Sequence, residues 1–279
     1  MRIALLASGS SGNALLVQAG STSVLVDAGI SARRLSRTLR QSGVEADSVD
    51  AVLLTHGHAD HTNGLGTLSA RHAHPVYATQ GTLGEVAWRL AEGCPVRAVV
   101  PGRPFAVGEL EVLPFEVSHD SAEPVGFSIS DGRARVTVAT DLGTVSPPVR
   151  RHLSSSDCVV LESNHDEKML LDGPYPWHLK QRILADTGHL SNGAAAREIE
   201  RVAGGPLRVL VLAHLSRRNN TPALALAAAR EALDRAARPD VTVTVGDQFE
   251  VVGPLDATSG VPQTGQLALD VGERCTRSR

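Results

Sequence analysis

The chain has 279 residues, of which 42% are hydrophobic, 20% charged and 3% aromatic, and its formal net charge is −3. This composition is ordinary for a globular protein with a core of Val, Leu, Ile and Ala, and it excludes a protein coated in basic charge for nucleic acid. No apolar run is long enough to span a bilayer, and the apolar residues 1–6 continue into Ser and Gly without a signal-type cleavage site, so we expect a cytoplasmic protein with no membrane segment.

Short apolar segments separated by turn residues dominate the first half of the chain. We predict strands over residues 3–7, 14–17, 23–26, 51–55, 110–118, 125–130 and 133–139, with helices over 31–41 and 82–92. In the second half, strands over 158–162, 207–213, 241–245 and 249–252 alternate with helices over 176–186, 191–202 and 221–236. This order is typical of two sheets packed face to face with helices outside, in one domain over 1–254. Residues 255–279 are predicted to be a flexible C-terminal tail.

Residues 56–61 read His-Gly-His-Ala-Asp-His and directly follow the predicted strand 51–55. Imidazole and carboxylate are ligands of zinc, and they also suit manganese or iron. One short loop does not easily wrap a single ion with four ligands, so two divalent metal ions with further ligands from elsewhere are the simpler interpretation. A polar loop rich in histidine is the alternative, but α/β folds place their sites at strand ends such as this one.

Candidates for the remaining ligands follow other apolar strands. His119, Asp141 and His214 each come at or just after the end of one. Any one of them alone could be a surface or capping residue, but together with residues 56–61 they form a set. Two divalent ions would bring four positive charges against two negative charges from Asp60 and Asp141, so the site could attract phosphate although the chain is slightly acidic.

These residues, in this order, resemble the motifs of the metallo-β-lactamase superfamily, which also carries an early Asp such as Asp27. The resemblance implies an αββα four-layer sandwich, in which two mixed β-sheets are flanked by helices. It implies His56, His58 and His119 on one metal, Asp60, His61 and His214 on the other, and Asp141 bridging them. Asp27 would support the loop without binding metal. A metal-bridging hydroxide would be the nucleophile, and Asp60 could orient it.

Blocks outside these ligands are similar to the YycJ/WalJ group of bacterial exonucleases, and the second half also resembles RNase Z. The similar blocks are residues 8–13, 162–166, 175–176, 179–183, 188–192 and 214–220. The resemblance implies a 5′ to 3′ DNA exonuclease with a suggested role in DNA repair. It makes DNA the more expected nucleic-acid substrate and RNA the alternative.

The same blocks contain candidates for substrate contacts. His189 precedes a helix capped by Ser191, near a positive helix end, and the resemblance to RNase Z implies that it contacts the scissile phosphate or protonates the leaving oxygen. Ser191 and Asn192 are candidates to hold phosphate oxygens. The remaining candidates are Ser10, Ser11 and Asn13, which could instead make a tight turn, and Ser216 and Asn219. Arg217 and Arg218 lie between the last two and could line a nucleic-acid path or belong to a solvated loop.

Three functions compete at this point. A DNA exonuclease or RNA-processing nuclease is the first, a small-molecule hydrolase of the glyoxalase II or lactonase type is the second, and a regulatory protein with structural metals is the third. The complete ligand set argues against the third. The blocks at Gly188-His189 and His214-Leu215-Ser216 favour the first over the second. The sequence leaves the oligomeric state open, with a dimer among the options.

Overall fold

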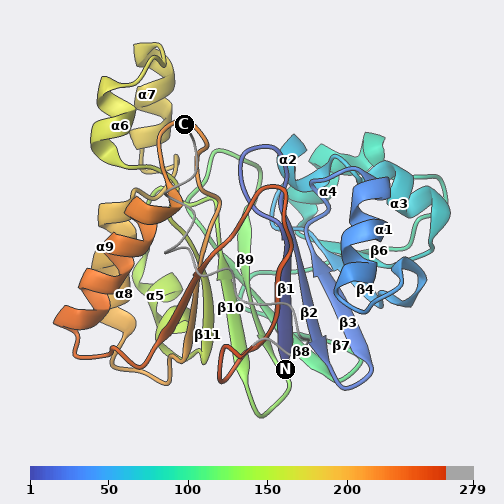
Figure 1. The fold of residues 1–279 in the computed structure, drawn as a ribbon. Coiled ribbons are helices and arrows are strands. Elements are labelled where there is room, and N and C mark those ends of the chain that lie inside the picture. The colour runs from blue at the N-terminus through green and yellow to red at the C-terminus, as the bar shows by residue number, and fades with distance from the viewer. Residues whose placement is uncertain (262–279) are drawn as a thin grey trace, which may run out of the picture.

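The computed structural model describes residues 1–261, which form two seven-stranded sheets packed face to face (Figure 1). The first sheet has the order β14-β1-β2-β3-β4-β5-β6. Its strands are β1 (Arg2–Ala7), β2 (Ala14–Ala19), β3 (Thr22–Val26), β4 (Ala51–Leu53), β5 (Val76–Ala78), β6 (Val96–Ala98) and β14 (Val252–Asp256). Strands β14 to β3 pair antiparallel, and β3 to β6 pair parallel.

The second sheet has the order β13-β12-β11-β10-β9-β8-β7. Its strands are β7 (Phe105–Val107), β8 (Leu110–Glu116), β9 (Val125–Ser130), β10 (Arg135–Ala139), β11 (Cys158–Glu162), β12 (Val209–Ala213) and β13 (Thr242–Val245). Strands β7 to β10 pair antiparallel, and β10 to β13 pair parallel. Each sheet is therefore mixed, as expected.

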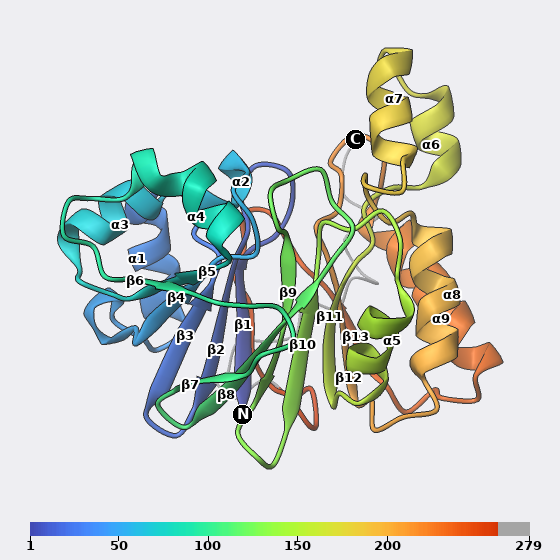
Figure 2. The same ribbon diagram turned by 180° about the vertical axis from the view of Figure 1, so that it is seen from behind.

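Helices cover the outer face of both sheets (Figures 1 and 2). The first sheet carries α1 (Ala32–Gln41), α3 (Leu65–Arg71) and α4 (Gln80–Val86), and the second carries α5 (Pro147–Ser154), α8 (Asn192–Val202) and α9 (Pro222–Arg235). The short α2 (Ala59–Thr62) lies at the upper edge, where α6 (Glu167–Asp172) and α7 (Trp177–Leu184) project above the second sheet. The predicted αββα sandwich is confirmed.

Side chains along each strand point alternately toward the core between the sheets and toward the helices outside, which explains the layered packing. In β3, Val24 and Val26 pack into the core between the sheets, whereas Leu25 packs outward against the helices. Successive side chains of a strand point to opposite faces, and both faces of these sheets are covered, so a central strand such as β12 is apolar throughout. Phe127 of β9 is the largest fully buried side chain and lies in the layer between the sheets.

Some elements differ from the expectation. The predicted strand 249–252 shares only Val252 with β14, which runs from Val252 to Asp256 and pairs with β1 in the first sheet. Because Leu255 pairs with Ile3 and Ala257 is buried, the folded domain continues past residue 254. The rest of the predicted tail, residues 262–279, lies outside the described residues.

Several short elements were not predicted at all. These are β5, β6, β7, α2, α3, α5 and α6, because strands of three residues show too little periodicity and the short helices lie between stronger signals. Within residues 1–261, no helix has the length and apolar character needed to cross a membrane.

Candidate metal centre

The site lies at one edge of the sandwich, where the parallel strands of both sheets end (Figure 1). From β3, β10 and β12 the chain turns sharply at Asp27, Asp141 and His214, whose φ angles are 63°, 58° and 56°. Left-handed backbone at non-glycine residues is uncommon and concentrates at functional sites, where the surrounding structure holds it. These three turns aim their side chains at the space between the two sheets.

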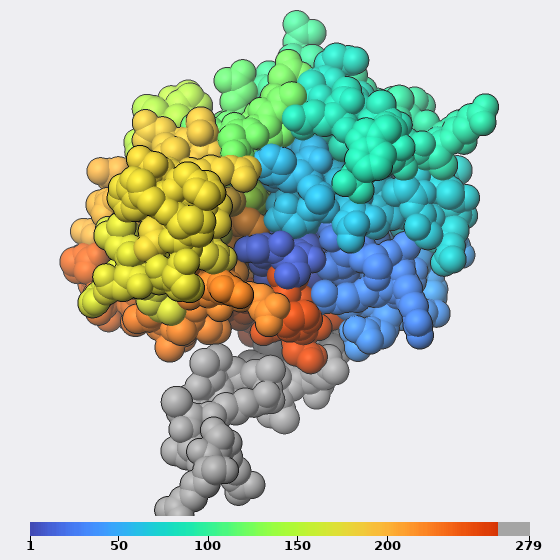
Figure 3. Space-filling model, turned by 90° about the horizontal axis from the view of Figure 1, so that it is seen from above, coloured from blue at the N-terminus to red at the C-terminus, as the bar shows by residue number. Residues whose placement is uncertain are grey.

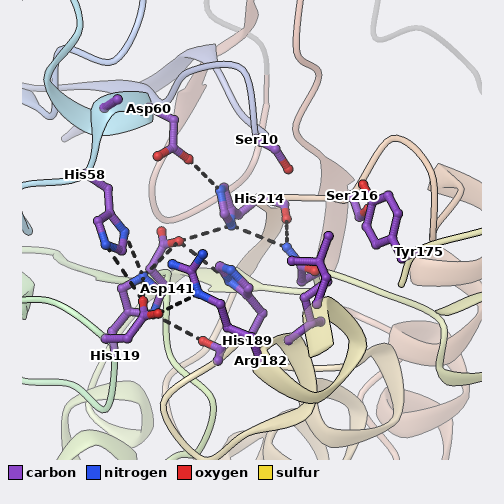
Figure 4. Close-up of a pocket in the computed structure, with 16 residues that line it drawn as sticks. Ser10, His58, Asp60, His119, Asp141, Tyr175, Arg182, His189, His214 and Ser216 are labelled. Carbon is purple, nitrogen blue, oxygen red and sulfur yellow. Dashed lines mark hydrogen bonds and ion pairs between the residues drawn. The ribbon is translucent and has the colours of Figure 1, made fainter. Parts of the chain in front are cut away.

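A pocket opens at this edge between the projecting helices α6 and α7 (yellow) and the blue and cyan segments of the first sheet (Figure 3). Its lining includes six of the predicted site residues that carry ionisable side chains: His58, Asp60, His119, Asp141, His189 and His214. Figure 4 shows these side chains pointing toward one another from distant parts of the chain. His56 and His61 lie beneath them, fully buried.

The predicted ligands fall into two neighbouring groups. In the first, one ligand atom each of His56, His58 and His119 lies within 4.8 Å of the others, and His58 Nδ1 is 3.2 Å from His119 Nε2. In the second, Asp60, His61 and His214 meet the same limit, and Asp60 Oδ2 is 3.3 Å from His214 Nε2 and 3.7 Å from His61 Nε2. Two further groups overlap these two: His56 with His61 and Asp141, and His214 with Asp141, Glu162 and His189. The division of the six residues between two ions stays a prediction.

Asp141 lies between the two groups. Its carboxylate oxygens are 3.1 Å from His61 Nε2 and 3.3 Å from His214 Nδ1 in one group, and 3.8 Å from His119 Nε2 in the other. The Asp141 side chain is 3% exposed, and a buried carboxylate must be paired or bound to a cation. Its place suits a ligand shared by both groups.

Buried polar atoms without partners test whether these residues fit a metal. Six buried side-chain atoms of the described residues have no hydrogen-bond partner, and two of them, His56 Nε2 and Asp141 Oδ2, belong to the predicted ligands. Asp141 Oδ2 has an ion-pair contact with His61 Nε2 at 3.1 Å. Native proteins rarely leave such atoms unsatisfied unless an ion or water completes them. Both atoms belong to the ligand set, whose imidazole and carboxylate chemistry suits a divalent metal. The residues therefore fit the metal that the sequence predicted.

Three histidines turn the same ring nitrogen toward the protein and the other toward the site. Nδ1 of His56 is 3.0 Å from Thr55 Oγ1, Nδ1 of His61 is 2.7 Å from Asp27 Oδ2, and Nδ1 of His119 is 3.2 Å from the carbonyl oxygen of Gly188. Such contacts fix the ring orientation and turn Nε2 toward the site, where His61 Nε2 also lies 3.0 Å from Asn13 Nδ2.

Asp27 contacts no other ligand than His61. Its carboxylate also accepts hydrogen bonds from the Thr55 backbone N–H at 2.9 Å and from Thr55 Oγ1 at 2.8 Å. Asp27 therefore anchors the start of the histidine segment to the end of β3. This is the supporting position that the resemblance implied, with Thr55 as an additional member that the sequence reading missed.

The electrostatics of the second group show how strongly it attracts positive charge. Burial lowers the pKa of His214, but Asp141, Asp60 and Glu162 outweigh burial and raise the pKa to about 10. Burial raises the pKa of Asp141, yet His214 and His61 together hold it well below its usual value. By contrast, burial and the neighbouring His61 lower the pKa of His56 well below its usual value. Without metal, the carboxylates are thus neutralised by protonated histidines.

His189 stands on the wall of the pocket beside both groups, at the turn before α8. Its Nδ1 is 2.7 Å from Glu162 Oε1 and 3.6 Å from Asp141 Oδ1. Glu162 is completely buried at the end of β11, is also 3.1 Å from His214 Nδ1, and accepts a hydrogen bond from the Leu142 N–H. The Glu162 carboxylate therefore orients both His189 and His214.

Only some of the predicted substrate contacts reach the pocket. Ser10 and Ser216 line it, as Figure 4 shows. Ser11, Asn13, Ser191, Asn192 and Asn219 are not among the lining residues, and their role in substrate binding stays a prediction. Most of these side chains are buried and serve the fold, because each sits where two loops meet.

Their hydrogen bonds show what these side chains contact. Asn13 Oδ1 accepts from the Gly9 N–H, and Ser191 caps α8 while its hydroxyl donates to Glu167. Asn192 bonds to Ser163 and Asn220. Asn219 is 1% exposed, and its backbone N–H donates to Ser216 Oγ. These contacts hold the loops that carry Ser10, His189 and Ser216.

Four further residues of the site were not predicted as site residues: Glu162, Asp120, Arg182 and Tyr175. Arg182 Nε donates to Asp120 Oδ2 at 2.7 Å, and Asp120 Oδ1 is 3.5 Å from His119 Nε2. Glu162 directly follows an apolar strand, the signal that identified the metal ligands, and could have been found by it. Arg182 and Tyr175 carry no such local signal.

Residues 22–215 match the family model of the Beta-lactamase superfamily domain. The structure is similar to that of the metallo-β-lactamase-fold protein YhfI from Bacillus subtilis, with a TM-score of 0.69 and 20% identity over 90% of this chain and 98% of that one. Fold and ligand groups together define a metal-dependent hydrolase of the metallo-β-lactamase fold.

Sequence identity to two relatives shows which family within this superfamily the chain belongs to. Exodeoxyribonuclease YycJ from Bacillus anthracis is 34% identical over 259 residues, covering 90% of this chain and 94% of its own. Ribonuclease Z from Bradyrhizobium sp. (strain ORS 278) is 30% identical over 167 residues, covering 53% and 54%. The chain belongs to the YycJ/WalJ family of the metallo-β-lactamase superfamily, with a partial likeness to ribonuclease Z.

Proposed function

We propose that this protein is a phosphodiesterase that binds two divalent metal ions and degrades DNA from the 5′ end. The observation that carries the proposal is the match to exodeoxyribonuclease YycJ, because it covers nearly the whole of both chains. The site geometry agrees with it, since His189 and its partner Glu162 stand beside two groups of metal-type ligands.

We assign His56, His58 and His119 to one ion, Asp60, His61 and His214 to the other, and Asp141 to both. Zinc, manganese and iron all suit this mixture of nitrogen and oxygen donors. When bound, the ions would supply a hydroxide nucleophile at neutral pH and polarise the phosphate. Asp60 lines the pocket with a partly exposed carboxylate, which could also accept a hydrogen bond from the attacking water.

His189 is assigned the proton transfer to the leaving oxygen. Burial lowers the pKa of His189, but Glu162 outweighs burial and raises it above its usual value, which favours the protonated ring. Nδ1 is held by Glu162, which leaves the other ring nitrogen for the substrate. A protonated imidazole at the pocket wall can give its proton to the departing oxygen as the P–O bond breaks.

Arg182 lines the pocket with its Nε held by Asp120, and its remaining N–H groups and the Ser10 and Ser216 hydroxyls can donate to phosphate oxygens. These groups support a phosphate diester over an uncharged thioester or lactone. A second candidate, an RNA-processing nuclease, is favoured by the identity to ribonuclease Z, but that match covers only about half of each chain. We therefore place DNA first.

The test is to incubate the purified protein, with manganese or zinc, with duplex DNA labelled at the 5′ or the 3′ end, single-stranded DNA, RNA and a thioester. We expect the 5′ label to be released first as a short product, while the 3′-labelled strand shortens gradually. Asp141→Asn should abolish cleavage, and Asp47→Asn, at a carboxylate 85% exposed and far from the site, should not. Cleavage of the thioester alone would contradict a nuclease function, and early release of the 3′ label would contradict the polarity.

A further inference from the structure

An exposed aromatic side chain flanked by arginines lies beside the pocket and has no part in the reaction proposed above. Phe249, in the loop between β13 and β14, is 53% exposed. The guanidinium carbon of Arg217 lies 5.0 Å from the centroid of its ring, and that of Arg34 lies 5.6 Å from it. We call these three side chains the Phe249 platform.

The platform continues directly from the pocket wall. Ser216 lines the pocket, and Arg217 is the next residue along the chain. Ser10 also lines the pocket, and the neighbouring Ser11 N–H donates to Gln248 Oε1 at 2.8 Å, immediately before Phe249. In Figure 3 the dark-blue, orange and red segments that contain these residues meet beside the hollow. A chain leaving the pocket on this side would cross Phe249.

The arginines of the platform carry positive charge that their acidic neighbours offset only in part. Within residues 1–261, neither Arg34 nor Arg217 forms an ion pair, although Arg34 donates to the backbone carbonyl of Gln248. Asp247 and Glu250 lie in the same loop and offset part of the charge. The Asp247 carboxylate already accepts the N–H groups of Phe249 and Glu250 at 2.7 and 2.8 Å, which holds the loop in shape. Further arginines, Arg33 and Arg37, are exposed on α1.

We propose that the Phe249 platform binds the unpaired strand of DNA that runs between the metal-binding pocket and the protein surface. This inference rests on the proposed nuclease function. The two guanidinium groups lie over the Phe249 ring, so ring and guanidinium planes together form the stacking surface. Bases that stack on such a surface, with guanidinium groups also in reach of the phosphates, are bound as a single strand with little regard to sequence. An exonuclease needs such tolerance, because every nucleotide of the strand must pass the same place.

The test compares Phe249→Leu, Phe249→Trp and Arg217→Gln with the intact protein, all loaded with metal. Binding of a phosphorothioate single strand is followed by fluorescence anisotropy, cleavage of the natural strand gives KM and kcat, and bis(p-nitrophenyl) phosphate reports on the pocket alone. Arg133→Gln is the matched control, because Arg133 is exposed in the β9–β10 turn at the opposite edge of the sandwich.

Phe249→Leu should weaken single-strand binding about 5- to 100-fold and raise KM similarly, and Phe249→Trp should restore both. Arg217→Gln should reduce the slope of log affinity against log salt by about 0.7, as expected for one phosphate contact. Turnover of bis(p-nitrophenyl) phosphate should stay unchanged in all variants, and Arg133→Gln should match the intact protein.

Unchanged DNA binding and KM in Phe249→Leu would overturn the platform while leaving the nuclease function intact. A parallel loss of bis(p-nitrophenyl) phosphate turnover would also overturn it, because the substitution would then act through the pocket. If the platform variants weaken the binding of single-stranded RNA but not of single-stranded DNA, DNA is not the ligand of the platform. Failure of the intact protein to cleave any nucleic acid would instead contradict the proposed function itself.

Discussion

His189 is the residue on which the proposed chemistry most depends, and it belongs to neither of the two ligand groups described above. Its ring faces Glu162 at 2.7 Å, while the nearest oxygen of Asp141 is 3.6 Å away. His189→Ala should therefore keep both metal ions but lower kcat about 10²- to 10⁴-fold, the usual contribution of a general acid. Metal content by mass spectrometry and initial rates on DNA would check this. His178→Ala, on the exposed side of α7, is the control. Loss of metal from His189→Ala would show that His189 is a ligand.

Glu162 gives a second prediction at this scale, which concerns pH. The pKa of His189 is lowered by burial and raised more strongly by Glu162, so Glu162→Gln should lower it. If His189 acts while protonated, activity falls as pH rises through this pKa. The alkaline limb of the kcat–pH profile should therefore move to lower pH in Glu162→Gln. Glu167→Gln, whose carboxylate contacts Ser191 and not His189, should leave the limb in place. An unmoved limb in Glu162→Gln would contradict the role of His189.

At the scale of elements, the site depends on close packing of the loops that follow β1, β3 and β4. The Asn13 N–H donates to the Asp60 carbonyl, and the Gly29 N–H donates to the Asn13 carbonyl, both at 2.8 Å. A Cβ atom on Gly29 would lie 1.7 Å from the Asp60 carbonyl oxygen, so only glycine lets these loops approach. The Ser/Gly segment at residues 8–13 thus supports the ligand loop more than it faces the substrate.

We expect Gly29→Ala to destabilise the protein by about 1–3 kcal/mol, because the added atom must displace backbone. Gly84→Ala is the matched control, since Gly84 lies inside α4 with open space around it. It should be neutral or stabilise the protein by about 0.5–1 kcal/mol. Urea unfolding of both variants would measure the difference. Equal stabilities would show that the loops can separate without cost.

Helix and strand prediction worked where periodicity was long enough. The amphipathic α1 begins after Ser31, whose hydroxyl accepts from the Arg34 N–H, and this cap was visible in the sequence. Strands of three residues such as β5 and β6 were invisible, because their existence depends on the neighbouring strands that they pair with.

For the whole molecule, the metal centre joins ligands from both sheets, so metal should stabilise the assembled sandwich. An ion present at 100 times its Kd adds about 2.7 kcal/mol to the free energy of unfolding, or about 5–10 °C in Tm for a domain of this size. Thermal unfolding with zinc and with a chelator would measure the difference. A His72→Ala, His74→Ala double variant, which removes a histidine pair outside the ligand groups, should keep the full shift. A Tm independent of zinc would contradict the metal site.

The sequence by itself determined the ligand chemistry and the edge of the fold on which it lies. Residues 56–61, His119, Asp141 and His214 could be recognised because imidazole and carboxylate are properties of single side chains, and because the end of an apolar strand is a local signal. The two-sheet architecture likewise follows from the order of strands and helices.

Only the tertiary structure decided which of these groups touch. Glu162 meets His189 across 27 residues and His214 across 52, and Arg182 meets Asp120 across 62. Such contacts depend on strand order and register, which a local pattern does not contain. Tertiary packing also decides which side chains are buried. Asn192 and Asn219 look like surface polar residues in the sequence, and only the packing of neighbouring loops places them inside the protein and leaves Phe249 exposed beside the pocket.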